Sequence, residues 1–232
     1  MLIDVKRLQP TLILLSFIMF IQAAQAQDWA NLKKYQQQNS QLTPLTQGEK
    51  SVVFMGNSIT EGWKNIRPEF FEGKPYVNRG ISGQTTPQML IRFTQDVIDL
   101  RPEAVVILAG INDIAGNTGP TTQKMITDNI FAMAKLAKAH NIKVLLCSVL
   151  PANDFPWRPG LEPAQKVIDL NDELKAFAKE HKITYVDYFS AMVNEQNGLK
   201  AELGSDGVHP NTAGYLVMEP ILEKALDKTL KR

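Results

Sequence analysis

Three polar side chains in this sequence are of the types that together perform nucleophilic catalysis. Ser58 follows the apolar run Val-Val-Phe-Met and a glycine, and Asp206 and His209 lie three residues apart near the C-terminus. A carboxylate that accepts the N–H of an imidazole fixes the tautomer of the ring, and the ring can then take the proton of a serine hydroxyl. We therefore predict Ser58 as nucleophile, His209 as its base and Asp206 as the residue that orients the base.

Taken singly, each of these residues has a simpler interpretation. A serine after a strand most often caps a helix, and an aspartate before a glycine often bonds its own backbone in a turn. Ser58 also lies outside the G-x-S-x-G turn of α/β-hydrolases, because Thr60 stands where the second glycine would be. His140 and His181 end amphipathic segments beside lysines, where a solvated helix-terminal role is expected. The catalytic hypothesis therefore depends on whether the fold brings the residues together.

Acyl transfer through a tetrahedral intermediate also needs donors for the negative oxygen, and loss of one donor costs about 10²–10³ in kcat. The candidates are the backbone N–H groups of Ser58 and Gly83 and the side-chain amide of Asn112. A glycine suits this role because a backbone without a side chain can approach a substrate closely. The alternative is that Gly83 and Asn112 are ordinary turn residues.

Short β-branched runs alternate with longer segments of helical period from residue 51 onward, which is typical of βαβ units and a parallel sheet. Three runs are apolar without alternation, as in strands covered on both faces. We predict a three-layer α/β/α sandwich over residues 51–232, with a helical extension over residues 27–50. The expected strands are 51–55, 75–78, 104–109, 142–149 and 183–186. The expected helices are 28–40, 87–100, 122–140, 163–182 and 211–230, the last capped by Asn211 and kinked at Pro220.

The candidate residues follow the ends of these strands. In open parallel sheets, ligand sites form at the carboxyl ends of the strands, which share one edge. Ser58, Gly83 and Asn112 each follow an expected strand, and the loop with Asp206 and His209 comes after the last one. The sequence therefore predicts that the five residues converge on one rim of the sheet.

The segments that carry these residues resemble, in order, the four sequence blocks of the SGNH (GDSL-type) hydrolases. They read Gly-Asn-Ser-Ile-Thr from residue 56, Gly-Ile-Ser-Gly-Gln-Thr from 80, Gly-Ile-Asn-Asp from 110 and Asp-Gly-Val-His-Pro-Asn from 206. The resemblance extends from about residue 51 to the C-terminus. It implies a flavodoxin-like five-stranded parallel sheet and an ester hydrolase with Ser58, Asp206 and His209 as its triad. It also implies Gly83 and Asn112 as oxyanion donors beside the Ser58 N–H.

One position departs from the family name, because Asn57 stands where the GDSL pattern has aspartate. Variants with asparagine here resemble the carbohydrate acetylesterase branch, so we expect Asn57 to bear on substrate binding. The segment 151–160 follows the fourth expected strand and carries Trp157 and Arg158. Trp157 could stack on a sugar ring and Arg158 could bond hydroxyls or a carboxylate. The alternative is a loop held by the packing of Phe155 and Trp157.

Composition excludes several classes of protein. The chain has 232 residues, with 25 Lys and Arg against 24 Asp and Glu, so it lacks the basic excess that nucleic-acid binding requires. Its single cysteine, Cys147, allows neither an internal disulfide nor a cysteine-based zinc site. We expect no metal and no cofactor. Trp63, soon after Ser58, is expected to fill the core.

The first 26 residues are typical of a secretory signal peptide. Lys6 and Arg7 precede the apolar run 11–21, and the small-residue triplet Ala24-Gln25-Ala26 follows it. A membrane anchor is the alternative, but the run is shorter than the roughly 20 residues that span a bilayer. We therefore expect cleavage after Ala26 and a secreted or periplasmic protein without a stable membrane anchor.

The resulting hypothesis is a secreted serine esterase that removes short acyl groups, most simply acetyl, from carbohydrate hydroxyls. No long apolar channel or lid is evident in the sequence, which argues against long acyl chains. The alternatives are a lysophospholipase or thioesterase for longer chains, and a carbohydrate-binding protein with a residual triad. A metal-dependent hydrolase that uses His209 and Asp206 is the least favoured, since the remaining histidines lie on other elements.

Overall fold

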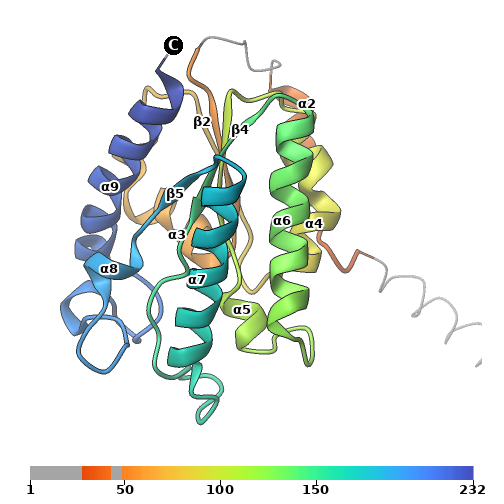
Figure 1. Cartoon of the computed structure of the whole chain (residues 1–232). Helices are drawn as coiled ribbons and strands as arrows, with labels where there is room; N and C mark the ends of the chain where they lie inside the picture. The colour runs from red at the N-terminus through yellow and green to blue at the C-terminus, as the bar shows by residue number, and fades with distance from the viewer. Residues whose placement is uncertain (1–27, 43–48, 232) are drawn as a thin grey trace, which may run out of the picture.

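Five parallel strands form the central sheet of the computed structural model, which describes residues 28–42 and 49–231 (Figure 1). The strand order is β2-β1-β3-β4-β5, with every neighbouring pair parallel. This is the flavodoxin-like order of doubly wound sheets, so the predicted fold class is confirmed. The strands are β1 (Val52–Gly56), β2 (Tyr76–Gly80), β3 (Ala104–Leu108), β4 (Lys143–Cys147) and β5 (Thr184–Val186).

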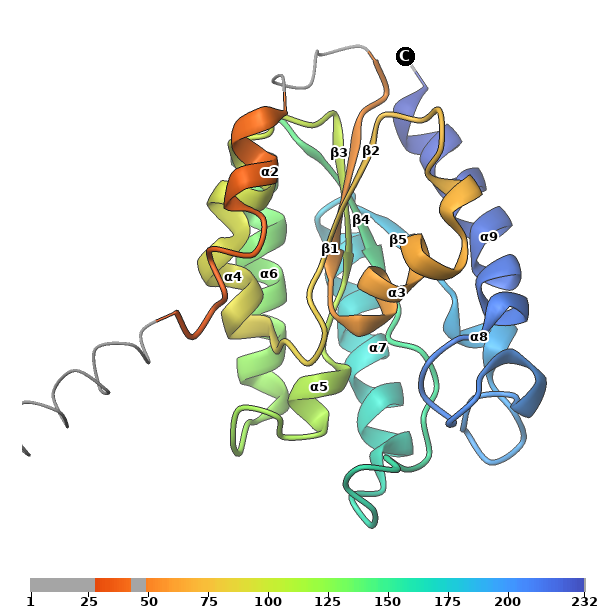
Figure 2. The ribbon, with the colours of Figure 1, turned by 180° about the vertical axis from the view of Figure 1, so that it is seen from behind.

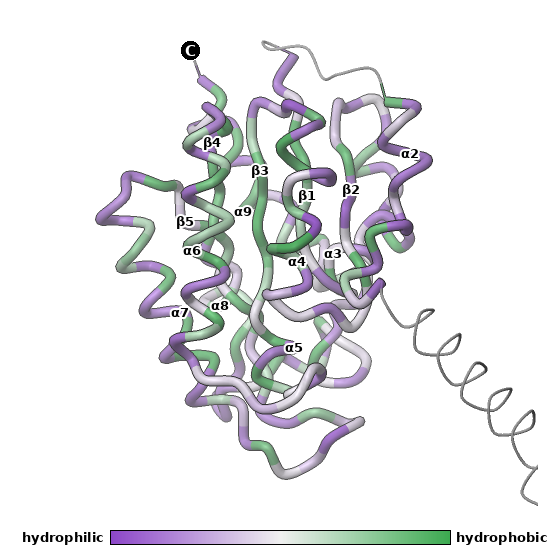
Figure 3. Tube along the Cα trace, turned by 90° about the vertical axis from the view of Figure 1, so that its right-hand side faces the viewer, coloured by the Kyte–Doolittle hydropathy of each residue, from purple (hydrophilic) through white to green (hydrophobic). Residues whose placement is uncertain are grey.

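Helices cover both faces of the sheet (Figure 2). Alternate residues of β1 point to opposite faces, so Val53 and Met55 join one core and Val52 and Phe54 the other. All residues of β1 and β3 are buried, and the tube in Figure 3 shows β3 as predominantly hydrophobic. The first core includes residues of α4 (Thr86–Phe93), α5 (Ile111–Ile114), α6 (Gln123–Ala139) and α7 (Pro163–Glu180). The second includes residues of α3 (Ser58–Ile66), α8 (Phe189–Met192) and α9 (Thr212–Leu230).

The predicted helix ends agree with the structure where a local signal marks them. Asn211 caps α9, since its side-chain oxygen accepts a hydrogen bond from Gly214 N at 3.0 Å. The helix continues through Pro220. A capping box of Thr85 and Gln88 starts α4, which passes at its C-terminal end into one π-helical segment, η3 (Thr94–Ile98).

The predicted helix over residues 28–40 is wrong in extent. Only α2 (Gln36–Gln41) is helical, and residues 29–35 form turns instead. The Asp28 carboxylate accepts hydrogen bonds from Leu32 N and Lys33 N, and Asn31 lies in the left-handed region at φ 56°. Local side-chain bonds of this kind compete with a continuous helix. The short helices α5 and α8 were not predicted from the sequence either.

Trp63 lies in the second core, as predicted. It is 1% exposed, and its ring stacks between Phe70 at 5.0 Å and Tyr215 at 5.3 Å. Its indole N–H donates to Glu219 at 3.3 Å, which satisfies its one polar atom. Within the described residues, no helix is long and apolar enough to cross a membrane. The predicted signal peptide, residues 1–26, lies outside the described residues.

Candidate active site

The turn between β1 and α3 presents Ser58 as the first residue of a helix. Asn57 is the N-cap, and its side-chain oxygen accepts a hydrogen bond from Ile59 N at 3.1 Å. The N-cap of α3 is therefore Asn57 and not Ser58. Gly56 leaves no room for a side chain, since a Cβ would lie 2.0 Å from the Thr60 hydroxyl oxygen. The close packing of Thr60 against the end of β1 therefore requires a glycine at position 56.

The structure brings the three predicted triad residues together. Ser58 Oγ lies 2.9 Å from His209 Nε2, and His209 Nδ1 lies 2.7 Å from Asp206 Oδ2. These are hydrogen-bonding distances, although 151 residues separate the serine from the histidine. The geometry matches a nucleophile, a base and a carboxylate that orients the base.

Asp206 serves the turn and the imidazole at once. Its Oδ1 accepts hydrogen bonds from Val208 N at 3.0 Å and His209 N at 2.7 Å, while Oδ2 faces the imidazole. The bonds within the turn and the contact with the imidazole therefore use different oxygens of Asp206. Partial burial alone would raise the pKa of Asp206, but the hydrogen bonds from His209 and Val208 outweigh it and hold the pKa below its ordinary value. The carboxylate is thus ionised at neutral pH and accepts the imidazole N–H.

Two of the predicted oxyanion donors, the backbone N–H groups of Ser58 and Gly83, have no acceptor among the described residues. Gly83 has φ +77°, and a Cβ built on it would meet nothing within 4 Å. The glycine is therefore required by its backbone conformation and borders open space. Its carbonyl accepts a hydrogen bond from the Asn117 side chain at 3.1 Å.

Asn112 lies in α5, immediately after β3, and is 4% exposed. Its amide nitrogen donates one hydrogen to the main-chain oxygen of Gln84 at 3.0 Å. A side-chain amide has two such hydrogens, so one remains for a substrate oxygen. Ser58, Gly83 and Asn112 thus each follow the carboxyl end of a strand, as the sequence predicts.

Asp113, the next residue, was not selected from the sequence. Its carboxylate accepts hydrogen bonds from Thr86 N at 3.0 Å and Thr86 Oγ1 at 2.6 Å, which ties α5 to the start of α4. Burial raises the pKa of Asp113 to about 6, although the bonds from Thr86 oppose that rise. The only sequence signal for Asp113 was its place in the Gly-Ile-Asn-Asp segment.

Trp157 lies beside the triad. The centres of the Trp157 and His209 rings are 5.8 Å apart, with an angle of 42° between the ring planes. The Trp157 ring also packs against that of Phe155, with a centre-to-centre distance of 5.3 Å. Phe155 is fully buried, whereas Trp157 is 45% exposed. The loop is therefore held by Phe155, while nearly half of the Trp157 side chain stays exposed next to the imidazole.

The other two predicted substrate-binding residues are engaged by the protein itself. Arg158 Nη1 donates to the carbonyl oxygens of Ala115 at 2.6 Å and Gly116 at 2.8 Å. Asn57 is 1% exposed, and its amide nitrogen has no hydrogen-bond partner among the described residues. The Asn57 side chain could contact a substrate only after a rearrangement. An effect of Asn57 on substrate binding would therefore act through the N-cap of α3.

A cavity of about 460 Å³ lies next to these loops and was not foreseen from the sequence. None of the triad or oxyanion candidates lines it, but Asp113 and Arg158 do. Its wall also has an apolar part, formed by Ile114, Ile126, Leu161 and Leu170.

Comparison with known proteins gives a consistent result. Residues 54–217 match the GDSL-like lipase/acylhydrolase family. The esterase TesA of Pseudomonas aeruginosa is 30% identical over 200 residues, which cover 84% of this chain and 90% of that protein. An acetylxylan esterase of Geobacillus stearothermophilus is 28% identical over 159 residues, which cover 66% of this chain and 71% of that protein. A GDSL-like lipase from Bacteroides thetaiotaomicron, known from its crystal structure, is 49% identical in sequence. Its structure superimposes with a TM-score of 0.84, and the match covers 86% of this chain and 98% of that one.

The family match covers most of the chain and includes the turn with Ser58 and the loop with His209. The fold, the order of the motifs and the relatives all agree with it. The chain belongs to the GDSL-like lipase/acylhydrolase family and is an ester hydrolase.

Proposed function

We propose that this protein is a secreted serine esterase that removes short acyl groups, in particular acetyl, from carbohydrate hydroxyls. The observation that carries the proposal is the continuous hydrogen-bonded path from Ser58 Oγ through His209 to Asp206. Export rests on the signal-peptide pattern of residues 1–26 alone.

In this reaction the Ser58 oxygen attacks the acyl carbonyl while His209 takes the hydroxyl proton. The N–H groups of Ser58 and Gly83 and the Asn112 amide hold the negative oxygen of the tetrahedral intermediate. His209 then returns the proton to the leaving sugar alkoxide. Water attacks the acyl-enzyme through the same base and releases acetate and free Ser58.

The exposed face of Trp157 supports a carbohydrate as the leaving group. A sugar ring that stacks on this indole would place one hydroxyl near the imidazole 5.8 Å away. The similarity to an acetylxylan esterase supports the same class of substrate.

The apolar cavity favours a second candidate, hydrolysis of longer acyl esters. Its volume of about 460 Å³ exceeds what an acetyl group needs, and Ile114 and Leu161 supply an apolar lining. In that case the acyl chain, and not the leaving group, would determine specificity.

Hydrolysis of 4-nitrophenyl acetate, butyrate and octanoate separates these candidates. A short-acyl esterase should turn over acetate fastest, with kcat/KM falling by about tenfold or more toward octanoate, because a long chain would lack a site. Preference for octanoate would contradict the acetyl proposal and favour the cavity as an acyl site. Complete absence of turnover on all three esters, with carbohydrate binding retained, would favour a binding protein.

Replacement of Trp157 by alanine should lower kcat/KM on acetylated xylo-oligosaccharides by about three- to tenfold, the contribution of one aromatic contact. Turnover of 4-nitrophenyl acetate should change by less than about twofold, because that substrate has no sugar ring. Trp157→Phe should keep most of the activity on the oligosaccharide, and Leu136→Ala, at an exposed apolar side chain near the C-terminal end of α6, serves as the control. Equal losses on both substrates would show that Trp157 supports His209 and does not bind sugar.

A further inference from the structure

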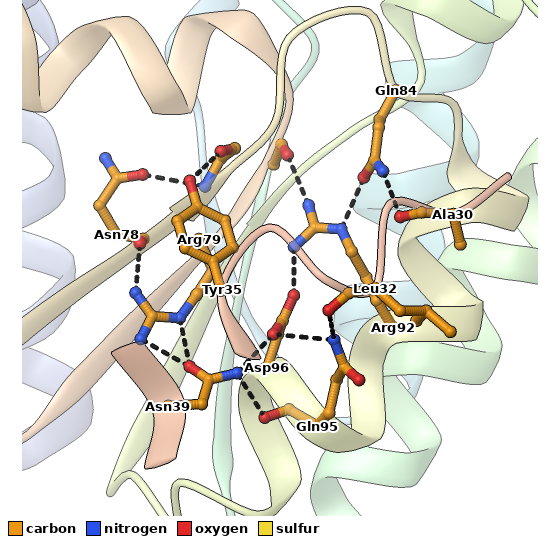
Figure 4. A network of polar contacts seen from close by, with 12 residues as sticks. Ala30, Leu32, Tyr35, Asn39, Asn78, Arg79, Gln84, Arg92, Gln95 and Asp96 are labelled. Atoms are coloured by element: carbon orange, nitrogen blue, oxygen red, sulfur yellow. Dashed lines mark hydrogen bonds and ion pairs between the residues drawn. The ribbon is translucent and has the colours of Figure 1, made fainter. Parts of the chain in front are cut away.

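The N-terminal segment, residues 28–42, adds no strand to the sheet, yet it is bonded to the loop that carries Gly83. Figure 2 shows it running along α4, and Figure 4 shows the polar contacts beneath it. The proposed reaction uses none of these contacts. These contacts, however, connect the N-terminal segment to the oxyanion candidates through Gln84.

Gln84 is the central residue of this network, and it directly follows Gly83 in the chain. Its side-chain nitrogen donates to Ala30 O at 2.7 Å, and its side-chain oxygen accepts from Arg92 Nε at 2.6 Å. Its main-chain oxygen accepts the hydrogen bond from the Asn112 amide. Gln84 is 3% exposed, so these bonds are shielded from water. One residue therefore contacts the N-terminal segment, α4 and one oxyanion candidate, and is adjacent to the other.

Arg92 extends the network to the Ser58 turn. Its Nη2 donates to Gly56 O at 3.0 Å, two residues before Ser58, and its Nη1 pairs with Asp96 at 2.9 Å. Arg92 and Asp96 are both 0% exposed. Replacing a buried ion pair by apolar residues of similar volume is often neutral or stabilising, so stability alone does not account for this pair. The same arginine bonds both the Gln84 side chain and Gly56 O, so it connects the Gly83 loop with the turn that carries Ser58.

A second set of contacts holds the same loop from the side of α3. Glu61 accepts hydrogen bonds from Ser82 N at 2.8 Å and Ser82 Oγ at 2.6 Å, and pairs with Lys34 of the N-terminal segment at 2.5 Å. Burial alone would raise the pKa of Glu61, but the bonds from Lys34 and Ser82 lower it, so the carboxylate is charged at neutral pH. The hydroxyl of Tyr35 donates to Gly80 O at the end of β2. The segment thus contacts the Gly83 loop from several directions.

We propose that Gln84 is a positioning residue for ester hydrolysis, and that the N-terminal segment acts through it to hold Gly83 and Asn112 as oxyanion donors. This inference rests on the proposed serine-esterase function. The donors must lie within hydrogen-bonding distance of the developing oxyanion, and small misplacements of such groups cost large factors in rate. Without the bonds to Ala30 and Arg92, the chain next to Gly83 would lose the side-chain anchor of Gln84 and would be held by the main-chain bonds to Asn117, Asn112 and Ile81 alone.

The test replaces Gln84 by methionine, which has a similar volume but neither a strong donor nor a strong acceptor. Arg92 is a poorer choice, since its removal would leave the Asp96 charge buried and unpaired. With 4-nitrophenyl acetate as substrate, Gln84→Met should lower kcat by about 10- to 100-fold and change KM by less than about threefold. Thermal unfolding is measured in parallel to show that each variant is folded.

Gln95→Met is the matched control. The Gln95 side chain also donates to a carbonyl of the N-terminal segment, Leu32 O at 2.7 Å, and more distantly to Asp96 at 3.5 Å, but it does not contact the Gly83 loop. It should retain kcat within about twofold of the wild-type value. The pair therefore compares the same chemical change with and without the connection to the oxyanion candidates.

A double-mutant cycle with Asn112→Ala separates positioning from general loosening. If Gln84 acts through the oxyanion donors, Gln84→Met should cost less in the Asn112→Ala background than in the wild type. Wild-type kcat in Gln84→Met, an equal loss in Gln95→Met, or the full loss persisting in the Asn112→Ala background would each overturn the inference. Absence of Ser58-dependent turnover by the wild type would instead refute the proposed esterase, and the positioning role with it.

Discussion

Replacing Ser58 by alanine is expected to lower kcat on 4-nitrophenyl acetate by about 10⁴- to 10⁶-fold, the loss found when a serine nucleophile is removed from a triad. The hydroxyl oxygen lies 2.9 Å from His209 Nε2, and no other described hydroxyl or thiol contacts that nitrogen. The fold should not change, because Asn57 and not Ser58 caps α3. Thermal unfolding of the variant should therefore match that of the wild type.

Ser190→Ala is the matched control for this experiment. Ser190 is an exposed serine whose hydroxyl donates to Asp187 at 2.8 Å and makes no hydrogen bond to a triad or oxyanion candidate. It should retain full activity. A loss of less than about tenfold in Ser58→Ala would show that another group is the nucleophile and would refute the assigned mechanism.

The residues at the carboxyl ends of the strands show which part of the site can be predicted from local sequence signals. Runs of apolar residues mark β1, β3 and β4 in the sequence, and the carboxyl ends of parallel strands must share an edge. Ser58, Gly83 and Asn112 could therefore be placed near one another before any coordinates, and the structure places them at successive strand ends. The contact of Ser58 with His209 follows from the same topology.

The network around Gln84 could not be predicted in this way. Its bond to Ala30 joins residues 54 positions apart, and its bond to Asn112 joins residues 28 positions apart. Such contacts depend on the packing of the N-terminal segment against α4, and no periodicity in the sequence records them. The burial of Arg92 could not be predicted either. An arginine in an amphipathic helix is normally solvated, whereas this one is 0% exposed.

The cavity beside Asp113 was also beyond sequence reasoning. Its apolar wall combines Ile114, Ile126, Leu161 and Leu170, which lie on different elements and would each be read as ordinary core residues. Volume left between packed elements depends on how the elements approach one another, which residue types alone do not specify. The expectation of no apolar channel was therefore an inference from absence, and the acyl-chain series tests it directly.

Substitutions in the loop from Asp206 to His209 should separate proton transfer from orientation. His209→Ala is expected to lose about as much activity as Ser58→Ala, because the proton of the serine then has no acceptor. Asp206→Asn should lose about 10- to 100-fold less. The side-chain oxygen of the asparagine can keep the hydrogen bonds from Val208 N and His209 N, which are 3.0 and 2.7 Å long with the aspartate. Its amide group cannot accept the imidazole N–H, so the wrong tautomer is favoured.

The matched control for this pair is Asp187→Asn, since Asp187 likewise accepts a backbone N–H with one oxygen and a side-chain donor with the other, at 3.0 and 2.8 Å. It lies outside the predicted triad and should leave kcat unchanged. Steady-state kinetics on 4-nitrophenyl acetate at neutral pH, with thermal unfolding as a check, measures all three variants. If Asp206→Asn lost more activity than His209→Ala, the carboxylate would be doing more than orienting the ring, and His209 could not be the principal base.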